Sequence, residues 1–109
     1  MRPETGWILL VTAGLLEIVW AAALRAAQGF TQPAPAALAI VAAGSSFTLL
    51  ALALRHLPLG LAYAVWVGIG AGGLALYGML ALDEAASPAR LGCIGLILAG
   101  VAGLKAIDG

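Results

Sequence analysis

Charge is what this sequence has least of. The chain of 109 residues has five basic and five acidic side chains, so 9% of it is charged, against about 25% in a typical soluble domain. So few charges cannot cover a surface that faces water, which excludes an ordinary soluble fold. The chain also has no basic stripe, which argues against nucleic acid as a partner.

Residues that carry enzyme chemistry are scarce as well. Cys93 is the single cysteine and lies in an apolar run, so an intrachain disulfide is excluded and a packing role is favoured. The run GIGAGG over residues 68–73 matches G-x-G-x-x-G, but no strand precedes it as a dinucleotide site requires. We find no cluster of metal ligands and no nucleophile beside a base. We therefore expect no enzyme, no cofactor and no metal.

Long apolar segments are what the sequence does contain, since hydrophobic residues make up 63% of it. A helix needs about 20 apolar residues to cross a bilayer. Segments that meet or nearly meet this length, separated by short loops, are residues 6–27, 34–54, 59–82 and 89–107. Gly29 follows the first segment as a helix stop, and Ser87 with Pro88 precedes the last as a helix start. The sequence predicts one all-α membrane domain over residues 1–109, with four antiparallel neighbouring spans.

The orientation of these spans in the membrane is almost undecided by charge. Arg2, Arg55 and Lys105 fall on one side of the predicted membrane, and Arg25 and Arg90 fall on the other. The positive-inside rule needs a clear excess of Lys and Arg on one side to fix a topology. A bias this small predicts that the same chain inserts in both orientations.

Glu17 is an acid in the middle of the first span, within the run GLLEIVWAAALR. At 1.5 Å per residue it lies about 17 Å deep in a hydrocarbon core ~30 Å thick. An ionised carboxylate there costs about 2.5–3.5 kcal/mol on insertion scales, and such residues usually serve a function. The group can hold a proton or a cation but not both well, which predicts a site where the two compete. The alternative is a packing role, with Glu17 hydrogen-bonded to a neighbouring helix.

Aromatic residues accompany this acid. Trp20 follows Glu17 by three residues and therefore shares its helix face, next to the small residue Gly14. In the third span Tyr63 and Trp66 lie on one stripe, and aromatic faces attract cations by up to ~2 kcal/mol when desolvated. A lipid anchor for Trp20 and plain aromatic packing in the third span are the alternatives.

Small and hydroxyl residues complete the pattern. Gly68 and Gly70 in the third span favour close packing or bending of that helix. Ser45 and Ser46 in the second span could donate to the Glu17 carboxylate, or bond back to their own helix.

The fourth span carries a small residue at every fourth position, namely Gly95, Ala99 and Gly103. Such a stripe suits close contact between membrane helices. One chain offers one central acid and little room for a cavity. A dimer joined through this stripe would supply two Glu17 carboxylates and a chamber between them.

The combination of features resembles the small multidrug resistance family over nearly the whole length. It consists of four short spans, a central Glu in the first, GF after that span, and PLGLAYAVWVGIG over residues 58–70. GLLEIVWA, WVGIGA and GLKA resemble the guanidinium-exporter branch most closely.

This resemblance implies a function and a set of site residues. Glu17 would bind both substrate and protons, and the residues of its pocket would be Gly14, Trp20, Ser46, Tyr63 and Trp66. The protein would be an antiparallel dimer in a prokaryotic inner membrane that exports guanidinium-type cations in exchange for protons. A homodimer and a paired heterodimer both fit. The alternatives are a polyspecific exporter of quaternary ammonium and other hydrophobic cations, and a helper subunit that transports nothing.

Overall fold

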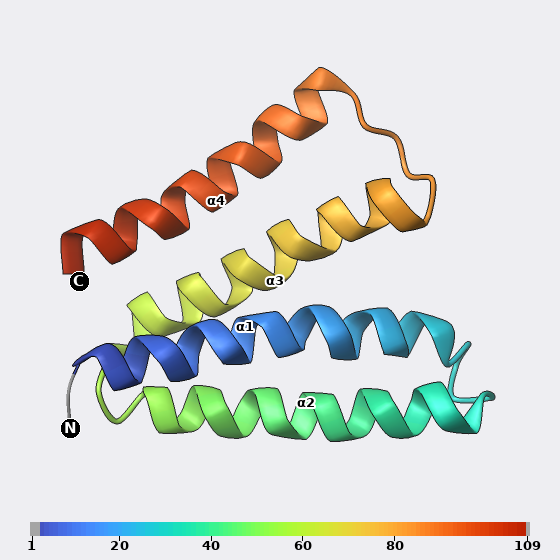
Figure 1. Cartoon of the computed structure of the whole chain (residues 1–109), viewed down its shortest axis with the longest axis horizontal. Helices are drawn as coiled ribbons and strands as arrows, with labels where there is room; N and C mark the ends of the chain where they lie inside the picture. Colours follow the sequence, from blue (N-terminus) through green and yellow to red (C-terminus); the bar gives the residue numbers. More distant parts are fainter. Residues whose placement is uncertain (1–2, 109) are drawn as a thin grey trace.

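The computed structural model describes residues 3–108, which form four helices joined by short loops and contain no strand. Figure 1 shows the helices α1 (Pro3–Ala26), α2 (Pro33–Ala53), α3 (Leu59–Ala81) and α4 (Pro88–Asp108). Each of the four is long and apolar enough to cross a membrane. The first helix begins at Pro3, three residues before the predicted start at residue 6. Arg2, one of the charges counted for topology, lies outside the described residues.

Local chemistry explains where the helices begin and end. The Ser87 hydroxyl accepts a hydrogen bond from the Arg90 backbone N–H at 3.1 Å, and Pro88 opens α4, so the predicted start signal is confirmed. After α1, Gln28, Gly29 and Phe30 adopt φ angles of 47°, 69° and 66°. Glycine adopts this left-handed conformation without steric cost, which makes Gly29 the stop that the sequence predicts.

Helix α1 is the central element of the chain. It packs along α2 on one side and against α3 on another, whereas α2 and α3 meet over only a short stretch. Helix α4 lies beside α3, on the far side from α2 (Figure 1). The helix that carries Glu17 is therefore the one with the most extensive helix contacts.

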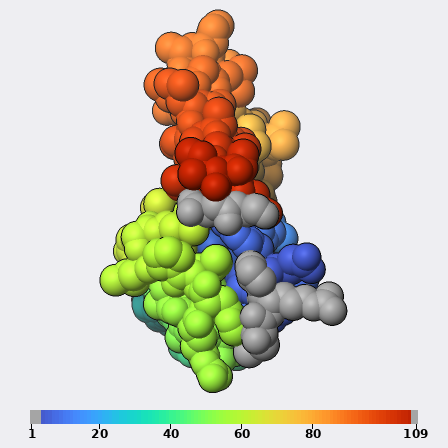
Figure 2. Space-filling model, turned by 90° about the vertical axis from the view of Figure 1, so that its left-hand side faces the viewer, coloured from blue at the N-terminus to red at the C-terminus, as the bar shows by residue number. Residues whose placement is uncertain are grey.

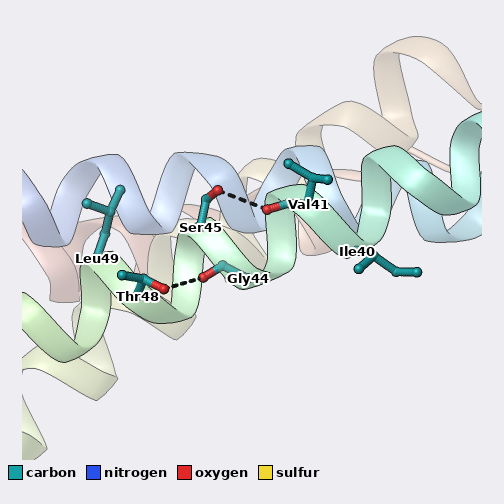
Figure 3. Close-up of a pocket in the computed structure, with 6 residues that line it drawn as sticks. All are labelled: Ile40, Val41, Gly44, Ser45, Thr48 and Leu49. Atoms are coloured by element: carbon teal, nitrogen blue, oxygen red, sulfur yellow. Dashed lines mark hydrogen bonds between the residues drawn. The ribbon is translucent and has the colours of Figure 1, made fainter.

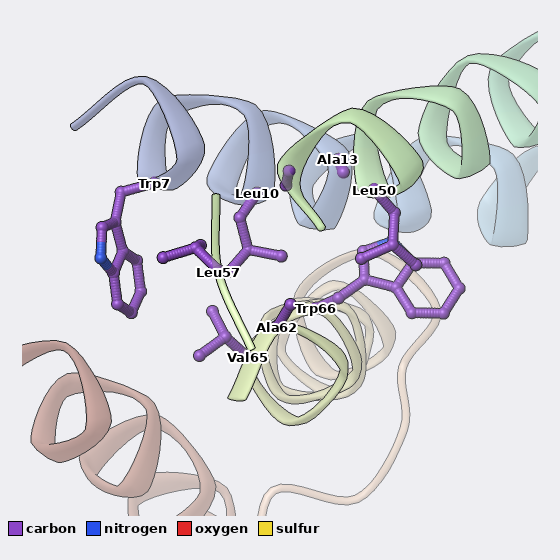
Figure 4. Close-up of a cluster of buried hydrophobic side chains, with 9 residues drawn as sticks. Trp7, Leu10, Ala13, Leu50, Leu57, Ala62, Val65 and Trp66 are labelled. Atoms are coloured by element: carbon purple, nitrogen blue, oxygen red, sulfur yellow. The ribbon is translucent and has the colours of Figure 1, made fainter. Parts of the chain in front are cut away.

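The hydrophobic core lies at one end of this arrangement, which we call the core end. It is built from the first half of α1, the last turns of α2, the loop after α2 and the first half of α3 (Figure 4). The buried residues of the cluster are Trp7, Leu10, Ala13, Leu50, Ala53, Leu57, Ala62, Val65 and Trp66. In a bilayer such a cluster stabilises through close van der Waals packing, because lipid tails are as apolar as the side chains.

The opposite end, which we call the cavity end, holds the second half of α1, the start of α2 and the end of α3. Three cavities of about 150, 340 and 380 Å³, all open to the surface, lie there among the described residues. Their walls include Trp20 and Phe30 in the first, Arg25 in the second, and Tyr77 in the second and third. The two ends of the same bundle thus differ sharply in packing.

Glycines let α3 approach helices on two of its faces. A Cβ added at Gly68 would lie 2.5 Å from Val101 of α4, and one added at Gly72 would lie 2.7 Å from Leu98. On its other face, a Cβ at Gly70 or Gly73 would run into side chains of α1. Helix α3 therefore sits between α1 and α4 at distances that only glycine permits.

Candidate functional site

The carboxyl group of Glu17 points from the middle of α1 at the backbone of α3. A Cβ added at Gly70 would overlap its Oε1 and Cδ atoms, so the carboxyl occupies the space that a side chain at Gly70 would fill. Oε2 is buried and has no hydrogen-bond partner among the described residues. A buried polar atom left unpaired costs about 1–3 kcal/mol. The fold itself therefore leaves Glu17 with binding capacity unused.

Close contacts surround this acid on the α1 helix. A Cβ added at Gly14, one turn earlier, would come 2.9 Å from the Cβ of Ile69, so Gly14 admits a side chain of α3. A Cβ added at Gly73 would overlap Ile18. Glycines of both helices thus fix the crossing of α1 and α3 at the level of Glu17. Gly14 lies in this helix contact, next to the acid.

Ser46 links three helices through its hydroxyl. Its partners are neither the Glu17 carboxylate nor its own helix, the two alternatives that the sequence left open. Its side chain is fully buried, and its hydroxyl donates to the carbonyl oxygen of Ala13 at 2.6 Å. The same hydroxyl accepts a hydrogen bond from Nε1 of Trp66 at 3.0 Å. Ser45 instead bonds back to its own helix, at the carbonyl of Val41. In this structure Ser46 orients Trp66 and does not bond the Glu17 carboxylate.

An aromatic row crosses the three helices next to this bond. The ring of Trp20 lies 6.2 Å from that of Phe47, which lies 5.3 Å from that of Trp66. Tyr63 follows, 5.5 Å from Trp66, all four rings being tilted relative to their neighbours. Phe47 and Tyr63 are 51% and 54% exposed, whereas Trp66 is 5% exposed. Trp66 is therefore the buried member of the row, and Phe47 and Tyr63 are its half-exposed members.

Phe47 is the member of this row that the sequence reasoning missed. It follows Ser46 directly, so the two side chains leave the helix in different directions, and no spacing rule linked it to Glu17. The composition of the span was the available signal, because Phe47 is one of two phenylalanines in the chain and is the single aromatic residue of the second span.

The Nε1 of Trp20 is the second polar atom of the site that the fold leaves unpaired. It is buried and has no partner among the described residues. Trp20 lies one helical turn from Glu17 on the same face of α1. The indole N–H of Trp20 and the carboxylate of Glu17 are thus neighbours along α1, and neither Nε1 nor Oε2 has a hydrogen-bond partner among the described residues.

The largest hollow described lies elsewhere, on the outer face of α2 (Figure 3). It measures about 540 Å³, and all of the six lining residues belong to α2. Its hydroxyls are already engaged, since Ser45 donates to Val41 and Thr48 donates to the carbonyl of Gly44. Within residues 3–108 no other element forms an opposite wall to the hollow, so it is not an enclosed site.

Known proteins are similar in sequence to this chain. The family model described as Small Multidrug Resistance protein matches residues 5–97. A guanidinium exporter of Citrobacter freundii is 54% identical over 99 residues, which cover 91% of this chain and 94% of that protein. A guanidinium exporter of Salmonella typhimurium shows the same identity and coverage, and one of Yersinia pestis is 52% identical with 91% and 95% covered.

These relatives are bacterial, and the match extends over nearly the full length of both chains. Together with the four apolar helices, they identify a multi-pass protein of the inner membrane. The family match covers the acid in α1, the serine in α2 and the aromatic segment of α3. The chain therefore belongs to the small multidrug resistance family.

Proposed function

We propose that this protein exports guanidinium or small guanidinyl cations in exchange for protons, with Glu17 as the group that binds both. The observation that carries the proposal is the Glu17 carboxyl in mid-helix, with one buried oxygen that no described residue pairs. The relatives that cover most of this chain are named guanidinium exporters, which supports the substrate class. The proposal includes no bond-making step, so it describes a transporter and no enzyme.

The chemistry of guanidinium suits these groups. Guanidinium is flat and presents N–H donors in its plane, and a carboxylate can accept two of them side by side. It has no acceptor, so the Trp20 N–H cannot bind it and would instead donate to the carboxylate. Protonation of Glu17 removes the negative charge and with it the attraction for the cation. Binding of a proton and binding of the cation therefore exclude each other.

The aromatic row would complete the pocket. Tyr63 and Phe47 expose their rings, and a desolvated cation gains up to ~2 kcal/mol beside such a face. Ser46 holds the Trp66 indole by a hydrogen bond, so this ring would act as a fixed wall. Gly70 would set the position of the carboxyl, since its missing side chain is what admits Glu17.

The site would be completed by a second copy of the chain in the antiparallel orientation. Helix α4 offers the surface for this contact, because no described residue of another element lies within 4 Å of a Cβ added at Gly95 or Gly103, and Ala99 is exposed. The hollow on α2 likewise lacks an opposite wall within the chain. A dimer would bring two Glu17 carboxylates to one chamber, and rocking of the two copies would expose it to either side. A paired homologue could replace the second copy.

A second candidate within the family is export of quaternary ammonium or other bulky hydrophobic cations. The observation that favours it is the exposed aromatic surface of Phe47 and Tyr63, which would accept a cation without N–H donors. Such a cation could not use the bidentate geometry of Glu17. The two candidates therefore differ in which part of the site binds.

Currents from reconstituted liposomes would test the proposal. Guanidinium should evoke a current in the wild-type protein, tetraalkylammonium ions little or none, and Glu17→Gln should abolish it, a loss of at least about a hundredfold. Currents mainly with tetraalkylammonium would support the second candidate. Silence with both classes from intact dimers would contradict transport and support the helper subunit.

A further inference from the structure

Lys105, near the end of α4, lies over the ring of Trp7 in α1. Its Nζ atom is 5.0 Å from the ring centroid, within the distance of a cation–π contact. Figure 2 views the molecule from this side, with the red end of α4 and the blue start of α1 on the same face. The contact ties the last turns of the chain to its first helix.

This contact is notable because the backbone of α4 lies beside α3 and beside no other helix. Leu98 and Val101 pack on the glycine face of α3, at Gly72 and Gly68. Leu98, Val101 and Lys105 are spaced three and four residues apart, so they form one inner face of α4. Lys105 extends this face beyond α3 to α1.

Trp7 is well placed to pass a movement on to the site. It is 6% exposed and belongs to the core cluster, onto which Val101 also packs. Trp7, Leu10, Gly14 and Glu17 follow one another at intervals of three, four and three residues, so they share one face of α1. A helix is stiff over this length of about 15 Å, so a shift at Trp7 moves the Glu17 end as well.

We infer that Lys105 is a positioning residue that couples α4 to the helix carrying Glu17 through the Trp7 ring. Movement of α4 is transmitted to α1 through this contact, in addition to the indirect path through α3. The inference rests on the proposed function, in which the second copy contacts α4 and the two copies rock against each other. Lys105 itself does not touch the bound cation, so its loss should slow the cycle and leave binding unchanged.

A lysine at the end of a membrane helix has two simpler roles. It can extend to the lipid headgroups, and its charge complements the negative C-terminal end of the helix dipole. Neither role involves the Trp7 ring. A double-mutant cycle between Lys105 and Trp7 therefore distinguishes coupling through the ring from these two simpler roles.

The test compares Lys105→Met, Trp7→Leu and the double variant in liposomes, with Lys105→Arg as the conservative rescue. Arg55→Gln is the matched control, since Arg55 is an exposed cation at the same end of the bundle. Lys105→Met and Trp7→Leu should each lower guanidinium turnover about threefold to tenfold, the range expected for one cation–π contact. The double variant should lose no more than the worse single one. Guanidinium Kd should stay within about twofold, and Lys105→Arg should restore turnover.

Amide hydrogen exchange provides a readout that does not depend on transport. Exchange over the last two turns of α4 should rise in Lys105→Met and Trp7→Leu alike, and stay at the wild-type rate in Arg55→Gln. Additive effects on turnover, wild-type turnover in Lys105→Met, or unchanged exchange in α4 would each overturn the coupling role. A wild-type protein that moves no guanidinium would instead refute the proposed function, while the exchange data still decide whether the contact holds α4.

Discussion

The core end and the cavity end of the bundle are both built from α1, α2 and α3, yet the first is tightly filled and the second is not. The core end buries large side chains, among them Leu10 at 0% and Trp7 at 6% exposure. The described residues of the cavity end line three surface-open cavities of about 150 to 380 Å³. Glu17 lies at the boundary between them, where α1 crosses α3. Closely packed side chains thus lie on one side of Glu17, and the less closely packed half of the bundle lies on the other.

The difference follows from the composition of α1. Its first half contains GWILLV, and its last turns read WAAALRA. Large apolar side chains fill the space between the helices at the first end, whereas alanines leave it open at the second.

The largest expected effect is a loss of unfolding free energy at the core end, caused by Leu10→Ala. Leu10 is fully buried in the core cluster, and truncation of such a residue costs about 2–5 kcal/mol of unfolding free energy. Leu38, which lines a cavity and is 52% exposed, provides the control, and Leu38→Ala should cost less than ~0.5 kcal/mol. Unfolding in mixed detergent measures both. Equal losses would mean that the two ends are equally packed in the membrane.

A smaller effect, on binding, is expected at the boundary between the ends. A Cβ added by Gly70→Ala would overlap the Glu17 carboxyl group and displace it, and overpacking of this kind costs about 1–3 kcal/mol. Guanidinium Kd should therefore rise about fivefold to 150-fold. Gly60→Ala is the matched control in the same helix, since nothing lies within 4 Å of a Cβ there. An unchanged Kd in Gly70→Ala would show that Glu17 does not bind in this position.

The smallest effect is expected where the core end meets the aromatic row. Ser46→Ala removes the donor to the Ala13 carbonyl and the acceptor for the Trp66 indole, which should lower unfolding free energy by about 1 kcal/mol. Ser45→Ala, one residue earlier, removes only a bond within α2 and should be close to neutral. Calorimetric titration with guanidinium would show whether the freed Trp66 also weakens binding. Identical stabilities of the two variants would contradict the bridging role of Ser46.

The sequence predicted the elements well, because hydropathy and helix signals act locally. Four helices occur, and Ser87 and Gly29 act as the predicted start and stop. The sequence motifs also pointed to Glu17 and Trp66, which lie on the neighbouring helices α1 and α3. What it could not supply were contacts that depend on how the helices rotate and cross. The bond from Ser46 to Ala13 is one such contact.

Two further contacts of the site also depend on how the helices cross. Spacing within α3 could not reveal that Gly70 faces Glu17, because this depends on where α1 crosses it. Nor could spacing within α2 place Phe47 between two tryptophans of other helices. The dimer contact through α4 and the roles of the pocket residues stay predictions that transport and assembly measurements can test.

The glycines on two faces of α3 have a mechanical consequence. Most helices interlock because the ridges of one fit into the grooves of the other, and interlocked helices resist sliding. At Gly68 and Gly72, and again at Gly70 and Gly73, side chains of α4 and α1 occupy the space where α3 carries no side chain. We expect α3 to hold α1 on one side and α4 on the other in a fixed register, so that the three helices shift together and do not slide along one another.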